Sequence, residues 1–122
     1  MEPIIDQIVL SFYQKCQNDF LIGYLFQQKQ NFFSHTVLRL QYFWKRDLYK
    51  CLGLSYLVKD HINLNLYGSH MSFHLKKGEI GRWAVLFIET INENPQMPKI
   101  LSDLWKRRII IFRNLFWKRY SL

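Results

Sequence analysis

The sequence predicts an all-α fold of about five or six helices, and three observations support this prediction. Apolar residues recur every three or four positions in several long segments, which is the spacing of one buried helix face. Prolines and short polar runs separate these segments. No segment shows the strict alternation of apolar and polar residues that is typical of a half-buried strand.

The first predicted helix lies at the N-terminus. Pro3 suits a first helical turn, because its fixed φ fits there and its missing N–H is not needed. The apolar residues that follow at helical spacing are Ile5, Ile8, Phe12 and Cys16. A second helical segment is expected over residues 20–26, with Gly23 inside it.

A third helix is predicted from near residue 33 to about residue 49. Its apolar face consists of Val37, Leu40, Phe43 and Trp44. Between residues 51 and 68 the pattern loosens, and a loop with a helical turn is expected there.

Two further helices are predicted in the last third of the chain. The first carries Ile80, Trp83, Ala84, Phe87 and Ile91 at helical spacing. Residues 92–98 interrupt the pattern with two prolines. The final long helix then presents Trp105, Ile109, Phe112 and Phe116.

Length and composition favour one compact domain over residues 1–122, long enough to bury a real core. Aromatic residues make up 17%, which suggests a crowded interior or one shared with a flat molecule. The spacing of Cys16 and Cys51 does not demand a disulfide, so reduced thiols are expected. The sequence has no visible signal peptide and no long apolar stretch, so a cytoplasmic location is expected.

The net charge of +8 is concentrated near the C-terminus. Seven basic residues follow Pro98, and only Asp103 opposes them: Lys99, Lys106, Arg107, Arg108, Arg113, Lys118 and Arg119. Such a helix could simply expose a solvated face. The alternative functional hypothesis is a cofactor-free helical binding module that uses this helix on nucleic acid or an anionic membrane.

His70 and His74 are four residues apart and would share one face of a helix, as two zinc ligands often do. Zinc needs further ligands, and neither His61 nor the cysteines have a spacing that supplies one. A single histidine suffices as an axial ligand of an iron porphyrin. The surrounding motifs decide whether that option is credible.

Three motifs occur in a defined order: "FYQKC" with Phe12 and Tyr13, "TVLRLQYFW" with Phe43 and Trp44, and "GEIGRWAVLF" with Trp83. With Phe26 thirteen residues after Tyr13, and His70 thirteen residues before Trp83, the pattern resembles the group III truncated hemoglobins. The resemblance covers roughly residues 5–116.

The resemblance implies a truncated globin fold, a two-over-two helical sandwich around haem b. His70 would be the proximal ligand of a five-coordinate iron. Tyr13 and Trp83 would donate hydrogen bonds to dioxygen or nitric oxide, and carbon monoxide would also bind. The implied haem-contacting residues are Phe26, Val37, Leu40, Phe43, Trp44, His70 and Trp83.

The distal position departs from the family pattern, which places a histidine seven residues before the helix E phenylalanine. Counting back from Phe43 gives Thr36, and His35 lies one place earlier. With His35 distal, the same helix face would present Arg39 to the porphyrin and bury an unpaired charge. We therefore favour Thr36 as the distal residue and place His35 at the pocket edge.

The proximal assignment has a rival in His74, which lies nine residues before Trp83. The family's proximal histidine lies about thirteen or fourteen residues before that tryptophan, and this distance favours His70. Lys76, Lys77 and Arg82 are nearby cations that could meet the haem propionates. Nitric oxide dioxygenase or peroxidase-like activity would need an electron donor such as a reductase, and both the activity and the oligomeric state stay open.

Overall fold

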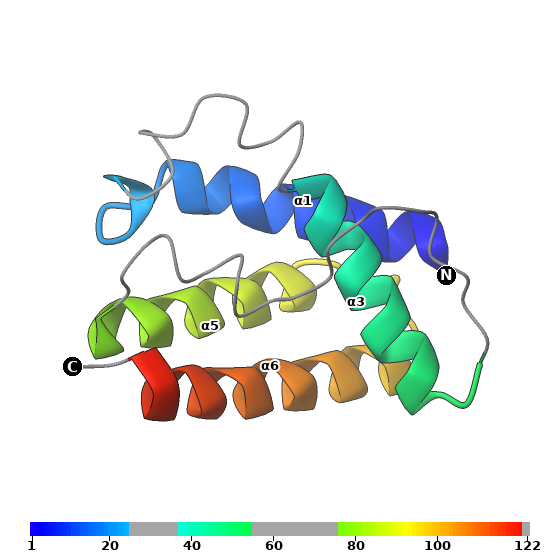
Figure 1. The fold of residues 1–122 in the computed structure, drawn as a ribbon. Helices are drawn as coiled ribbons and strands as arrows, with labels where there is room; N and C mark the ends of the chain where they lie inside the picture. The colour runs from blue at the N-terminus through cyan, green and yellow to red at the C-terminus, as the bar shows by residue number, and fades with distance from the viewer. Residues whose placement is uncertain (25–36, 55–75, 121–122) are drawn as a thin grey trace.

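The computed structural model describes residues 1–24, 37–54 and 76–120. Across these residues the chain forms helices and no strand, so the predicted all-α class is confirmed for the described part. The helices, shown in Figure 1, are α1 (Glu2–Gln17), α3 (Leu38–Cys51), α5 (Lys77–Asn92) and α6 (Lys99–Tyr120).

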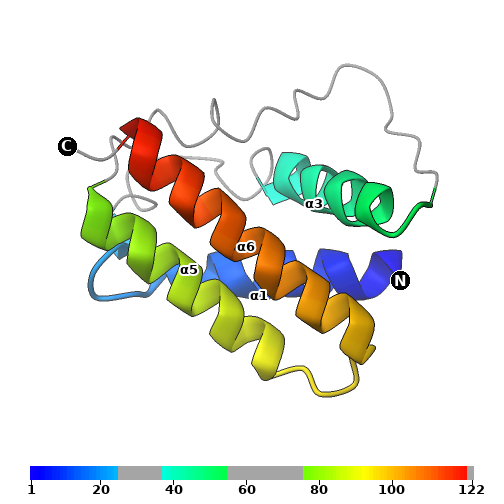
Figure 2. The same cartoon turned by 90° about the horizontal axis from the view of Figure 1, so that it is seen from below.

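The helices form two layers. Helix α1 packs on α3 in one layer, and α5 packs on α6 in the other. The layers meet where α1 contacts α5 and where α3 contacts α6. The view in Figure 2 shows α5 and α6 side by side, joined at one end by the short connection through residues 93–98. The core lies between the two layers.

Local sequence signals explain where these helices begin and end. Helix α1 carries Pro3 in its first turn, where no N–H is required. Helix α3 ends at Cys51, and Gly53, two residues later, turns the chain with a φ of 73° that suits glycine. There the Gly53 N–H donates to the Lys50 carbonyl (3.1 Å), and the Leu54 N–H donates to the Tyr49 carbonyl (2.8 Å). At the start of α5, the Glu79 carboxylate accepts the Lys76 N–H at 2.8 Å.

Three predicted helices are confirmed in existence and in their buried faces. Helices α1, α5 and α6 bury the apolar positions that the spacing selected. The third predicted helix is α3, which extends two residues past the expected end at Tyr49 to Cys51. In the described part of the 20–26 segment, residues 20–22 form a turn, and helix begins at Gly23.

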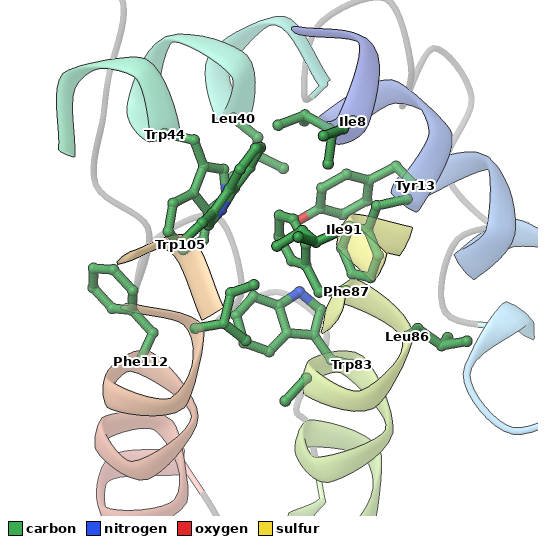
Figure 3. Packing of buried hydrophobic residues seen from close by; sticks show 14 of the residues in the cluster. Ile8, Tyr13, Leu40, Trp44, Trp83, Leu86, Phe87, Ile91, Trp105 and Phe112 are labelled. Carbon is green, nitrogen blue, oxygen red and sulfur yellow. The ribbon is translucent and has the colours of Figure 1, made fainter. Parts of the chain in front are cut away.

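Aromatic rings from all four helices meet around Phe87. Its ring stacks on Phe12 with centroids 4.0 Å apart. The rings of Trp44, Trp83 and Trp105 make edge contacts with the Phe87 ring, with centroid distances of 5.3, 5.8 and 5.4 Å. Such edge-to-face pairs add stabilisation beyond the burial of area. Figure 3 shows this cluster between the helices.

Ion pairs join elements that are distant in sequence. Arg108 on α6 donates to both carboxylate oxygens of Asp47 on α3, at 2.9 Å each. Arg82 on α5 pairs with Asp19, just after α1, at 2.7 Å. Neither described cysteine is in a disulfide: Cys16 is buried and Cys51 is exposed. None of the described helices is long and apolar enough to cross a membrane.

Candidate functional site

Tyr13 and Trp83 are the two predicted ligand donors that the structure describes, and both lie in the core. Tyr13 comes from α1 and is 1% exposed, whereas Trp83 comes from α5 and is 3% exposed. Phe12 lies next to both, with ring centroids 4.6 Å from Tyr13 and 6.2 Å from Trp83. Figure 3 shows the two side chains reaching into the same interior region from different helices.

The surroundings of Tyr13 raise the pKa of its hydroxyl. Burial is the main cause that raises the pKa of Tyr13 far above its ordinary value, and the nearby Cys16 adds to the effect. A hydrogen-bonding interaction with the Trp83 side chain lowers the Tyr13 pKa but does not cancel the increase. A neutral phenol and an indole N–H, both of which can donate hydrogen bonds, therefore share a dry, aromatic interior.

The predicted apolar face of α3 points into the core for the most part. Val37, Leu40 and Trp44 are buried, and Phe43 is half-buried. Arg39, which the register with His35 distal would bring to this face, is exposed. The buried face of α3 is therefore the face expected with Thr36 distal, and the distal residue itself stays a prediction.

Trp44 is held by the opposite layer. Its ring lies 5.3 Å from Phe87 on α5, and 5.8 Å and 5.4 Å from Trp105 and Phe112 on α6. These contacts make Trp44 a core residue of the described helices. Its contact with a haem, like those of Val37 and Leu40, stays a prediction.

Several predicted site residues lie outside the described residues. They are Phe26, His35, Thr36 and His70, together with the rival His74 and with His61. All four histidines of the chain therefore fall in residues 25–36 and 55–75. Within the described residues, no three His, Cys, Asp or Glu side chains gather in a group that could hold a metal ion. The axial ligand stays a prediction from the sequence.

A shallow depression beside α3 contains two cations that the sequence reasoning missed. Its volume is ≈ 180 Å³, and Phe43, Arg46, Asp47 and Lys50 line it. Asp47 is already paired with Arg108, which leaves the exposed Arg46 and Lys50 as the basic side chains at its rim. Arg46 and Lys50 follow Phe43 by three and seven residues, and this spacing places them on the same side of the helix as Phe43.

The cations that were expected at a propionate rim have other surroundings. Arg82 donates two hydrogen bonds to Asp19, from Nε at 3.1 Å and from Nη2 at 2.7 Å. The Lys77 ammonium lies over the Trp117 ring, 5.4 Å from its centroid. Lys76 is exposed at the start of α5. Of these three side chains, Arg82 is thus committed to holding the end of α1 against α5.

Two buried groups that can donate hydrogen bonds, Tyr13 and Trp83, lie among aromatic rings of the described core. A polar diatomic ligand in a dry site would use donors of this kind, and haem binding itself stays a prediction. Comparison of the chain with protein-family models, with curated proteins and with solved structures found no match. The function of the chain is therefore inferred from the motifs in its sequence and from the geometry of these residues.

Proposed function

We propose that this chain is a haem protein of the truncated hemoglobin type that binds dioxygen and nitric oxide. The observation that carries the proposal is the burial of Tyr13 and Trp83 in one aromatic interior. The two residues lie 70 positions apart in the sequence, on α1 and α5. Burying a hydroxyl and an indole N–H costs desolvation that an apolar ring such as phenylalanine would avoid. The two-layer pairing of α1 with α3 and of α5 with α6 supports the sandwich that the resemblance implies.

In the proposed site, bound haem supplies an iron atom that takes up diatomic ligands, with His70 as its protein ligand. Tyr13 donates a hydrogen bond from its hydroxyl, which is protonated at neutral pH as in any tyrosine. Trp83 donates from its indole nitrogen. Each such bond in a dry pocket is worth on the order of 1–3 kcal/mol and slows ligand escape about ten- to hundredfold.

Arg46 and Lys50 are the proposed partners of the haem carboxylates. Both are exposed on α3, both line the depression beside Phe43, and an exposed cation can meet a carboxylate without a buried charge. Asp47 lies between them in sequence but is neutralised by Arg108, so it does not repel an anionic group.

The first test is the absorption spectrum of the purified protein titrated with haemin. We expect a Soret band that saturates at one haem per chain. The His70→Ala variant should lose the five-coordinate ferrous spectrum, and His74→Ala should keep it. The axial assignment is wrong if the His70→Ala spectrum is unchanged, and absence of any Soret band refutes the haem proposal.

The second test compares dissociation of two ligands from the ferrous protein. Dioxygen accumulates partial negative charge when bound and carbon monoxide much less, so lost donors should affect dioxygen more. We expect Tyr13→Phe and Trp83→Phe each to accelerate dioxygen dissociation on the order of tenfold or more, with a smaller effect on carbon monoxide.

Matched controls exist on the same scaffold. Tyr49→Phe removes a half-buried hydroxyl from α3, and Trp105→Phe removes a buried indole N–H from α6. Both should leave the ratio of the two dissociation rates unchanged. Equal effects on both ligands in Tyr13→Phe would mean that the hydroxyl acts through packing, and the donor role would be wrong.

A further inference from the structure

Helix α6 carries a second feature that a haem site does not explain. Its inner face packs on α3 and α5 through Leu101, Trp105, Ile109, Phe112 and Phe116. On other faces of the same helix, aliphatic side chains lie in solvent: Ile100 is 75% exposed, Ile111 43% and Leu115 40%. Exposed aliphatic residues in this number on one helix call for an explanation.

The exposed residues form a stripe along α6. At 100° per residue, an arc of about 80° contains Ile100, Arg107, Ile111, Leu115 and Lys118, over a length of about 27 Å. A groove of ≈ 430 Å³ opens along the helix beside this stripe, lined by Lys106, Arg107, Ile110 and Ile111. Aliphatic and basic side chains therefore alternate on one continuous surface, which we call the α6 outer face.

Helix α6, which carries the α6 outer face, is strongly positive. Helix α6 has seven basic residues against Asp103 as its sole acid. Arg108 is paired with Asp47, and Arg113 lies over the Trp117 ring at 4.4 Å. Lys99, Arg107 and Lys118 are exposed.

The mixture of side chains favours one class of partner. A second copy of this chain would bring the same positive charges into opposition. Nucleic acid would match the charge, but bases stack on aromatic rings, and the exposed apolar side chains here are isoleucine and leucine. An anionic lipid surface matches both properties, because aliphatic side chains enter the acyl boundary while lysine and arginine meet the headgroups.

We propose that the α6 outer face binds anionic lipid surfaces, with α6 lying parallel to the membrane plane. The exposed aliphatic residues Ile100, Ile111 and Leu115 insert at the level of the headgroups. Arg107 and Lys118 lie in the same stripe and pair with lipid phosphates. The remaining helices keep their packing, since none of these five side chains belongs to the core.

The test is flotation of the full chain with vesicles made of equal parts phosphatidylcholine and phosphatidylglycerol. The affinity for vesicles of phosphatidylcholine alone should be lower by a factor on the order of ten or more. Added salt should weaken binding to the anionic vesicles. Arg107→Gln with Lys118→Gln should lower affinity for anionic vesicles on the order of tenfold. Ile100→Gln with Ile111→Gln should lower it by a similar factor at unchanged charge.

Control variants make the same kinds of change on other helices. Arg39→Glu makes an equal change of two charge units on α3, and Leu10→Gln with Val85→Gln removes exposed aliphatic residues from α1 and α5. Both controls should bind as the parent does. Circular dichroism of each variant establishes that the helices remain folded.

The proposal is wrong if the chain does not bind the anionic vesicles, or if the control variants lose as much affinity as the α6 variants. It is also wrong if the chain binds an oligonucleotide in a salt-sensitive way and the two isoleucine changes do not weaken that binding. The last result would assign the face to nucleic acid. The flotation assay does not require haem, so its failure would leave the haem proposal standing, and a missing Soret band would leave this one standing.

Discussion

Replacing Asp19 by asparagine tests the contact that fastens the end of α1 to α5. One carboxylate oxygen of Asp19 accepts two hydrogen bonds from the Arg82 guanidinium, at 3.1 Å and 2.7 Å. The other accepts the backbone N–H groups of Leu21 and Ile22, at 3.0 Å and 3.2 Å. An asparagine oxygen can keep the two backbone bonds, but its NH₂ group then faces Arg82 as a second donor.

The expected loss is set by the burial of the two partners. The Asp19 side chain is 4% exposed and that of Arg82 is 26% exposed. Loss of one partner of a fully buried pair costs about 3–5 kcal/mol, and the access of water to Arg82 lowers this figure. We expect Asp19→Asn to lower the free energy of unfolding by about 2–3 kcal/mol at neutral pH.

The pH dependence provides the sharper measurement. Burial tends to raise the pKa of Asp19, but the hydrogen bonds from Arg82, Leu21 and Ile22 lower it overall below its usual 3.8. The carboxylate therefore stabilises the folded chain above the pKa of unfolded aspartate, and this contribution is lost as pH falls through the lower pKa of the folded state.

Urea unfolding at several pH values measures this difference. The difference between the parent and Asp19→Asn should be constant from about pH 7 to pH 5 and should shrink below about pH 4. Asp103→Asn, a change at an exposed position on α6, should alter stability by about 0.5 kcal/mol or less. A difference that stays equal at about pH 7 and pH 3 would show that the charge of Asp19 does not carry the effect.

Three further substitutions test the close packing at glycine and the buried lysine. Gly23→Ala places a Cβ 2.8 Å from the Gln17 carbonyl oxygen and 3.3 Å from that of Cys16. Thermal unfolding of this variant should show a loss of stability of about 1–3 kcal/mol. The Cβ of Gly78→Ala meets no neighbour, so this variant should gain about 0.4–1 kcal/mol of stability. Lys45→Met keeps the buried stem but removes the ammonium 2.9 Å from Asp6. Urea unfolding should show a loss of about 1 kcal/mol, because the Asp6 side chain is 37% exposed and water can solvate part of its carboxylate. A loss in Gly78→Ala as large as in Gly23→Ala, or a gain of stability in Lys45→Met, would contradict these explanations.

The helices were predictable because their buried faces repeat at a period that the sequence displays. Trp105, Ile109, Phe112 and Phe116 follow one another at four, three and four residues, and all are buried in α6. The end of α3 was harder to place, because it depends on the positive φ of Gly53 and not on periodicity.

Long-range charge pairs could not be predicted in this way. Arg82 and Asp19 lie 63 positions apart, and Arg108 and Asp47 lie 61 apart, so no local spacing links them. This is why Arg82 was a candidate for a propionate partner and Arg46 and Lys50 were not. Lys45 is a similar case, since it follows Trp44 on a helix that looked amphipathic and is nevertheless buried through its pairing with Asp6.

Cys16 is buried and Cys51 is exposed, so the reaction of the two thiols with a reagent measures how often the core opens. Burial raises the pKa of the Cys16 thiol well above its ordinary value, so a thiol reagent reaches its reactive form only when the core opens. Cys51 stands exposed at the end of α3 and reacts without any opening. A single reagent therefore modifies the native protein in two separate phases. The rate of the slow phase measures how often the core opens around Cys16 on α1. A ligand that stabilises the core lowers this rate.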